Sequence, residues 1–263
     1  MITFVAAATE AARLAGEVLM NRSGMTKIEY KDSARKNLVS NIDREAEKTI
    51  VSYLSEHWPD HQILGEEGGE NRKNSPYKWI IDPLDGTTNY VHGFPFFSIS
   101  IGLEYKGVIQ AGVVFEPARN HLFSAEKGSG ARMNGETLSV SKVRRLSEAL
   151  LVTGFSYQAR TDQKENFENF YHFSRAAQAV RRTGSAALDL CYLASGFFDG
   201  YWELNLSPWD TAAGSLIVEE AGGRVTTFDG NPYSIYAKEI LASNGQIHGE
   251  MIEVLQKKSQ ALP

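Results

Sequence analysis

Cysteine, long apolar runs and surplus positive charge are all scarce in this sequence. Cys191 is the single cysteine, so an internal disulfide and a cysteine-based metal site are excluded. No apolar run reaches the roughly 20 residues that cross a bilayer, and the chain does not open on a basic stretch followed by an apolar core. We therefore expect a cytoplasmic protein that is neither secreted nor inserted in a membrane.

The charge balance also narrows the function. The formal net charge is -5, from 27 Lys and Arg against 32 Asp and Glu, which argues against nucleic-acid binding as the main purpose because such binding needs a basic face. With 42% hydrophobic and 22% charged residues, the composition is that of a globular protein. The length of 263 residues allows one large domain or two smaller ones.

The stretch at residues 79–89 carries the most chemistry. Residues 79–81 are apolar and predict a buried strand, after which Asp82 and Asp85 flank Pro83, a residue that favours a turn over a continued strand. Two carboxylates in one small volume repel each other, and Mg²⁺ relieves that repulsion because it prefers oxygen ligands such as carboxylates and the Leu84 carbonyl.

Next to these carboxylates, the same loop offers an anion site. Gly86 lets backbone amides approach a phosphate, and the hydroxyls of Thr87 and Thr88 can hold a water molecule. The alternative is a plain surface turn, since Asp, Pro and Gly are the usual turn residues. These residues alone do not separate the two interpretations.

The first half of the chain predicts two helices on an antiparallel sheet. Apolar residues recur every three or four positions over 5–19 and 42–54, as in amphipathic helices. Strands are predicted at 62–64, 96–105, 108–115, 122–125 and 138–140, with tight turns at Lys106-Gly107 and Asn134-Gly135.

A polar, basic stretch at 142–147 is the predicted boundary between an α+β domain (1–145) and an α/β domain (146–263). In the second part strands and helices alternate. The predicted strands are 150–153, 197–203, 224–228 and 240–242, and the predicted helices are 165–178, 185–194, 208–221 and 247–257. Cys191 falls in one of these apolar helices and is predicted to be a small buried hydrophobe.

Three further acidic residues each have a structural and a functional interpretation. Asp43, in a first helical turn, favours the positive end of the helix dipole or holds a nucleophilic water. Glu66, among glycines, is a solvated loop residue or a metal ligand. Asp210 completes a capping box with Ser207, a placement that also aims its carboxylate toward a metal.

The sequence resembles the inositol monophosphatase family of magnesium-dependent, lithium-sensitive phosphatases. Three blocks carry the resemblance, in this order: residues 65–67, residues 79–89, and the run from 208–210 to 220–223. The resemblance extends from Asp43 to the last predicted strand. It implies a layered αβαβα sandwich, with the site between an antiparallel half and an alternating α/β half, which agrees with the mixed α+β and α/β pattern above.

The resemblance also implies roles for individual residues. One Mg²⁺ would be held by Glu66, Asp82 and the Leu84 carbonyl, a second by Asp82, Asp85 and Asp210, and a weaker third by Glu66. Thr87, assisted by Asp43, would activate the attacking water, and the Gly86 and Thr87 amides would hold the phosphate. The substrate contacts would be Asp85, Ala186, Glu203 and Asp210. The family's lysine matches either Lys31 or Lys36.

The implied reaction is hydrolysis of inositol 1-phosphate to inositol and phosphate by a metal-activated water, in a homodimer. The expected substrate is a small phosphorylated polyol or sugar. The rival substrates are fructose 1,6-bisphosphate, adenosine 3′,5′-bisphosphate, histidinol phosphate and NADP, which related enzymes dephosphorylate with the same metal loop. A different class of function also stays open, since some bacterial relatives bind the transcription machinery.

Overall fold

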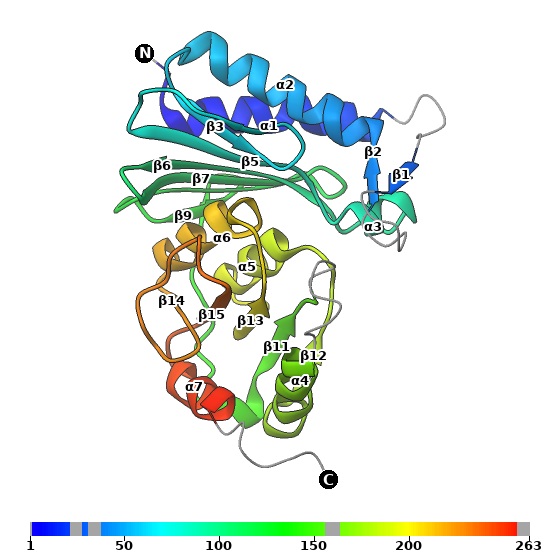
Figure 1. Cartoon of the computed structure of the whole chain (residues 1–263). Helices are drawn as coiled ribbons and strands as arrows, with labels where there is room; N and C mark the ends of the chain where they lie inside the picture. The colour runs from blue at the N-terminus through cyan, green and yellow to red at the C-terminus, as the bar shows by residue number, and fades with distance from the viewer. Residues whose placement is uncertain (1, 22–27, 31–37, 156–163, 257–263) are drawn as a thin grey trace.

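The computed structural model describes residues 2–21, 28–30, 38–155 and 164–256. Its layers alternate helix, sheet, helix, sheet and helix (Figure 1). α1 (Phe4–Met20) and α2 (Asn41–His57) form the first layer, α5 (Ala186–Ala194) and α6 (Pro208–Glu220) the middle one, and α4 (Lys164–Ala176) and α7 (His248–Gln256) the last. The predicted αβαβα sandwich is confirmed.

The first sheet has eight strands in the order β10-β9-β8-β7-β6-β5-β3-β4. Neighbours are antiparallel, except that β3 and β5 are parallel, so this sheet is mixed rather than purely antiparallel as expected. A separate ribbon pairs β1 (Ile28–Tyr30) with β2 (Leu38–Ser40). The strands of the sheet are β3 (Gln62–Gly65), β4 (Gly69–Asn71), β5 (Tyr77–Asp85), β6 (Ser98–Tyr105), β7 (Val108–Glu116), β8 (His121–Glu126), β9 (Ala131–Met133) and β10 (Glu136–Thr137).

The turns of this sheet explain one wrong prediction. Lys106 and Gly107 both have positive φ and join β6 to β7, as predicted. Asn134 and Gly135 also have positive φ, but they join β9 to β10, and no strand forms at 138–140. The turn pairs the residues on either side of it, so the short strands lie directly beside Asn134-Gly135 instead of several residues later.

The second sheet has five strands in the order β12-β11-β13-β15-β14. β11 is parallel to both of its neighbours, whereas β15 is antiparallel to β13 and β14. β12 was not predicted. The strands are β11 (Leu150–Thr153), β12 (Ala179–Arg181), β13 (Gly200–Leu204), β14 (Arg224–Thr226) and β15 (Glu239–Ser243).

The middle layer lies very close to the first sheet. A Cβ added at Gly102 or Gly112 would come within 2.9 Å of Ala212 or Ala213 on α6, so only glycines in β6 and β7 allow this approach. α5 and α6 contact both sheets. The division at 145/146 stays a prediction: each sheet comes from one side of it, but α5 and α6 of the second part pack on both sheets.

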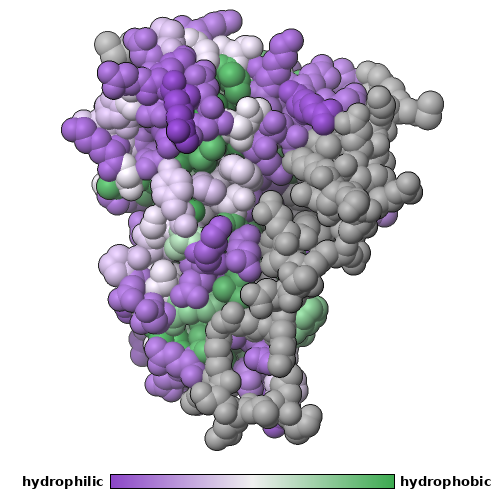
Figure 2. Space-filling view, in the orientation of Figure 1, coloured by the Kyte–Doolittle hydropathy of each residue, from purple (hydrophilic) through white to green (hydrophobic). Residues whose placement is uncertain are grey.

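Buried and exposed residues follow the sequence pattern. Ala8, Ala12, Ala15 and Leu19 form the buried stripe of α1, and Cys191 is buried as predicted. In the coloured part of the face shown in Figure 2, hydrophilic residues predominate and the apolar areas are small and separated. No helix in the described part of the chain is both long and apolar enough to span a membrane.

Candidate active site

Asp82 and Asp85 lie at the end of β5. The prediction that Pro83 ends this strand is wrong, because β5 continues to Asp85. Asp82 pairs with Ser100 and Asp85 with Ser98, so three steps along β5 match two along β6 and the strand bulges. The bulge accommodates a proline, which has no N–H for the ladder. Inside it, the Leu84 N–H donates to Asp82 Oδ1 at 3.0 Å.

The backbone turns sharply after Asp85. Gly86 has a φ of 94°, a conformation that other residues rarely adopt, and the short helix α3 (Thr87–Val91) follows it. The Thr87 hydroxyl donates to the Leu84 carbonyl at 3.1 Å. Thr87 therefore orients the carbonyl that the resemblance assigns to a metal.

Asp85 connects the first sheet to the middle layer. Its Oδ2 accepts hydrogen bonds from Ser185 Oγ at 2.6 Å and from the Ala187 N–H at 2.8 Å. Ser185 is the N-cap of α5, so the carboxylate lies at the positive end of that helix. This contact brings together two segments far apart in the sequence.

Asp210 and Glu66 are held by local backbone contacts. The Ser207 N–H donates to Asp210 Oδ2 at 2.7 Å at the start of α6, which confirms the predicted capping interaction. Glu66 lies in the turn between β3 and β4, and its N–H donates to the Ile81 carbonyl at 3.2 Å. The Asp210 side chain is thus fixed at the start of α6, and the Glu66 backbone is fixed against β5.

All four carboxylates line one cavity of about 140 Å³ between the two halves of the molecule. The wall also contains Leu84, Gly86, Thr87, Ala186 and Glu203, which places nine of the ten predicted site residues around one space. The remaining one, Asp43, is buried in the first turn of α2 and is not part of the described cavity wall. Lys31 and Lys36 lie outside the described residues.

The electrostatics of the cavity are those of crowded acids. Burial raises the pKa of Asp82 well above its ordinary value, and repulsion from Glu66, Asp85 and Asp210 raises it further. Burial likewise raises the pKa of Asp85 to about 6 and that of Asp210 well above the usual range. Among the described residues, no ion pair compensates Asp82, Asp85 or Asp210.

The oxygen atoms of these four carboxylates and of the Leu84 carbonyl are the type of ligand that a hard cation prefers, but they are too far apart to coordinate one. Several of them belong to carboxylates that line one cavity, which is the environment that Mg²⁺ favours. Within the described residues, however, no three His, Cys, Asp or Glu side chains lie close enough together to hold an ion. The carboxylates share a cavity without forming a closed cage, so they must move closer together to enclose a metal.

The cavity wall contains two more acidic side chains, Glu203 and Asp189, and one basic side chain, Arg182. Glu203 accepts a hydrogen bond from the Tyr201 hydroxyl at 2.8 Å, and burial raises its pKa to about 7. Asp189 is buried there as well. Arg182 is the only basic side chain among the described residues of the wall, and it is exposed.

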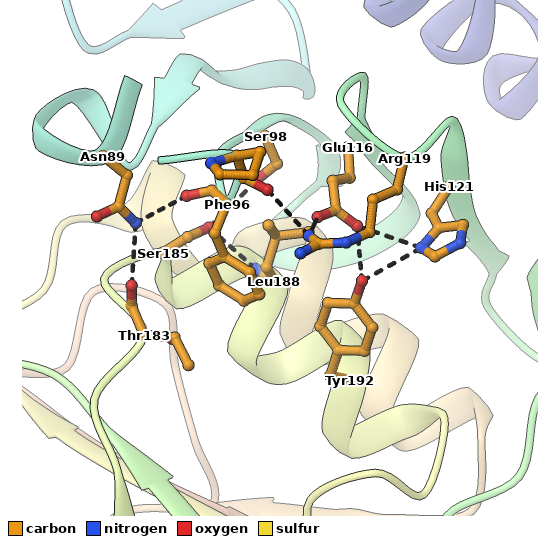
Figure 3. Close-up of polar contacts among 11 residues, drawn as sticks. Asn89, Phe96, Ser98, Glu116, Arg119, His121, Thr183, Ser185, Leu188 and Tyr192 are labelled. Carbon is orange, nitrogen blue, oxygen red and sulfur yellow. Dashed lines mark hydrogen bonds and ion pairs between the residues drawn. The ribbon is translucent and has the colours of Figure 1, made fainter. Parts of the chain in front are cut away.

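Sequence reasoning missed the residues that join the wall together. Asn89 donates from Nδ2 to the carbonyls of Phe96 at 2.8 Å and Thr183 at 2.9 Å, and so ties α3 to the loop before α5 (Figure 3). The sequence pattern predicts that Ser185 begins a helix, but it does not predict the hydrogen bond from Ser185 to Asp85. The sequence holds no signal for the contacts of Asn89 with Thr183 and of Asp85 with Ser185, because the partners are about a hundred residues apart.

A second missed network lies beyond this wall. Glu116 is fully buried and bonds Arg119, His121 and Tyr192, which links the end of β7 to α5 (Figure 3). Tyr192 Oη donates to Glu116 Oε2 at 2.6 Å. This network braces the helix whose N-terminus meets Asp85.

Comparison with known proteins shows which family has this sequence and fold. The model of the inositol monophosphatase family matches residues 2–260. An inositol-1-monophosphatase of Synechocystis is 40% identical, with 98% of this chain and 90% of that protein covered, and the Nus factor SuhB of Pseudomonas aeruginosa is 41% identical, with 95% and 94% covered. The solved structure of an inositol monophosphatase from Anabaena superposes with a TM-score of 0.87 at 43% identity, covering 97% of this chain and 95% of that one.

Proposed function

This chain belongs to the inositol monophosphatase family, and on that premise we propose that it is a Mg²⁺-dependent phosphatase that hydrolyses inositol 1-phosphate. The observation that supports this most is the convergence of Glu66, Asp82, Asp85 and Asp210 on one cavity. Such a concentration of negative charge in one partly enclosed cavity is unfavourable unless a cation binds there.

These four carboxylates and the Leu84 carbonyl would hold the metal, which supplies Lewis-acid activation of water and neutralises charge on the ester oxygens. The Gly86 and Thr87 amides, at the start of α3, would donate to the phosphate. Thr87 would orient the attacking water with the help of Asp43. Removal of either side chain should lower kcat more than it raises KM.

Glu203 supports a hydroxyl-rich leaving group. The Glu203 carboxylate is fixed by Tyr201 and borders the cavity, where it would accept hydrogen bonds from sugar or inositol hydroxyls. Arg182 favours the rival substrate class, because a guanidinium at the cavity wall could bind a second phosphate, as in fructose 1,6-bisphosphate.

A phosphate-release panel separates these substrates. We expect Mg²⁺-dependent release from inositol 1-phosphate, inhibited by lithium. Arg182→Ala should leave that reaction nearly unchanged if inositol 1-phosphate is the substrate, and should lower kcat/KM about tenfold for a bisphosphate if that class is preferred. Arg181→Ala is the matched control, since this neighbouring arginine is not part of the described wall. Absence of release from every ester would refute the proposal.

A regulatory role is the second candidate function, because some relatives of this chain are named Nus factor. Assembly as a homodimer and a cytoplasmic location also stay proposals. Recovery of RNA polymerase on an immobilised Asp85→Asn protein would favour the regulatory role, because that variant lacks the proposed catalytic centre.

A further inference from the structure

Glu47 stands on α2, one helical turn after Asp43, and only 6% of its surface is exposed. Its two carboxylate oxygens accept different hydrogen bonds. Oε2 accepts from the Glu67 N–H at 2.9 Å, and Oε1 accepts from the Gly68 N–H at 2.5 Å. Both donors belong to the turn between β3 and β4, which is the turn that carries Glu66.

The glycines of this turn leave room for that carboxylate. A Cβ added at Gly65 would lie 2.5 Å from Glu47 Oε2, and one added at Gly68 would lie 2.6 Å from Oε1. The space that side chains would occupy on either side of Glu66 is therefore filled by Glu47. The glycines are explained by this contact, beyond their general preference for turns.

The same turn is held from the other side by β5. The Glu66 N–H donates to the carbonyl of Ile81, the residue before Asp82. The backbone that carries Glu66 is thus fixed between α2 and β5. A displacement of this turn would move the Glu66 side chain relative to Asp82.

We propose that Glu47 is a positioning residue that fixes the Glu66 turn and thereby sets the affinity of the cavity for Mg²⁺. This inference rests on the proposed function, in which Glu66 is a metal ligand. A carboxylate is required, because both of its oxygens accept hydrogen bonds. A glutamine would turn an NH₂ group toward one of the two N–H donors.

The test is Glu47→Gln in the full chain, with Mg²⁺ binding to the metal-stripped protein measured by calorimetry and phosphate release measured against Mg²⁺ concentration. We expect about tenfold weaker Mg²⁺ binding, the lower end of the range for residues that orient metal ligands, with kcat restored at saturating Mg²⁺. Gly68→Ala should weaken binding in the same direction, because its Cβ displaces the carboxylate. It serves as the second variant should Glu47→Gln not fold.

Glu220→Gln is a closely matched control. The Glu220 carboxylate also accepts two backbone N–H bonds, from Gly128 at 2.7 Å and Gly130 at 2.8 Å, in a loop that is not part of the described cavity wall. It should lower thermal stability without changing Mg²⁺ affinity. If Mg²⁺ affinity were unchanged in the Glu47 and Gly68 variants, or equally reduced in the Glu220 variant, the inference about Glu47 would be overturned, but the proposed function would not. A wild-type protein that binds no Mg²⁺ would overturn the proposed function as well.

Discussion

Replacing Asp85 by asparagine should separate the stability of the protein from its activity. The hydrogen bonds from Ser185 Oγ and from the Ala187 N–H both end on Asp85 Oδ2, so an asparagine carbonyl can still accept the two. The tether between β5 and α5 is therefore kept. What is lost is one negative charge among the carboxylates that line the cavity.

The size of the effect follows from the pKa of Asp85. Burial raises it from an ordinary value of 3.8 to about 6, so the folded state favours the protonated acid. The raised pKa makes the protonated Asp85 side chain contribute to the stability of the folded state at low pH, and this contribution is lost as pH rises through about 6. At pH 8 the ionised group would then cost up to about 3 kcal/mol of unfolding free energy. Because Asp85 is partly exposed to the cavity, we expect screening to reduce this to about 1–2 kcal/mol.

The assay is urea unfolding at pH 8 with EDTA and again with excess Mg²⁺. Metal-free Asp85→Asn should be more stable than wild type by about 1–2 kcal/mol, and Mg²⁺ should stabilise wild type but not the variant. Phosphate release should fall to background. Asp85→Ala, which also loses the tether, should be less stable than Asp85→Asn. A metal-free asparagine variant less stable than wild type would refute this reasoning.

Other predictions concern the fold around the site. Burial lowers the pKa of His248 to about 4, so stability from its neutral ring is present above about 6.5 and lost as pH falls through 4. When the pH is lowered from 8 to 4, the unfolding free energy should therefore fall less in His248→Gln than in wild type, and the difference should be up to about 3 kcal/mol. Urea unfolding at both pH values measures this, and equal losses in the two proteins would contradict the prediction. Gly112→Ala should destabilise by about 1–3 kcal/mol, because its Cβ would meet the Ala213 backbone at 2.9 Å. Gly249→Ala, with no atom within 4 Å, should be neutral or slightly stabilising in thermal melts.

Sequence patterns predicted the elements better than the contacts between them. Sequence patterns placed α1, α2 and α4 to α7. α1 and α2 each bury an apolar stripe that the sequence displays directly, whereas α5 and α6 are buried nearly all round and were indicated by the residues at their ends. Periodicity failed for β9, β10 and β12, which are two or three residues long and too short to show alternation. Pro83 misled because a bulge, invisible in the sequence, accommodates it within β5.

For the site, motifs identified the acids but not what holds them. Asp82, Asp85 and Glu66 stand in recognisable local blocks, and the structure brings them to one cavity. The Asp85 contact with Ser185 and the Glu47 contact with the Glu66 turn depend on tertiary packing between distant segments. No local pattern encodes such pairs, so they could be found only from the fold.

The central claim is that Glu66, Asp82, Asp85 and Asp210 together bind divalent metal. Crystals of the wild-type protein soaked in Mn²⁺, a stand-in for Mg²⁺ that scatters anomalously, test it most directly. The account predicts anomalous peaks between these carboxylates, with at least one peak bonded to both Asp82 and Glu66. A cavity without a peak, or a peak held by other residues, would contradict it.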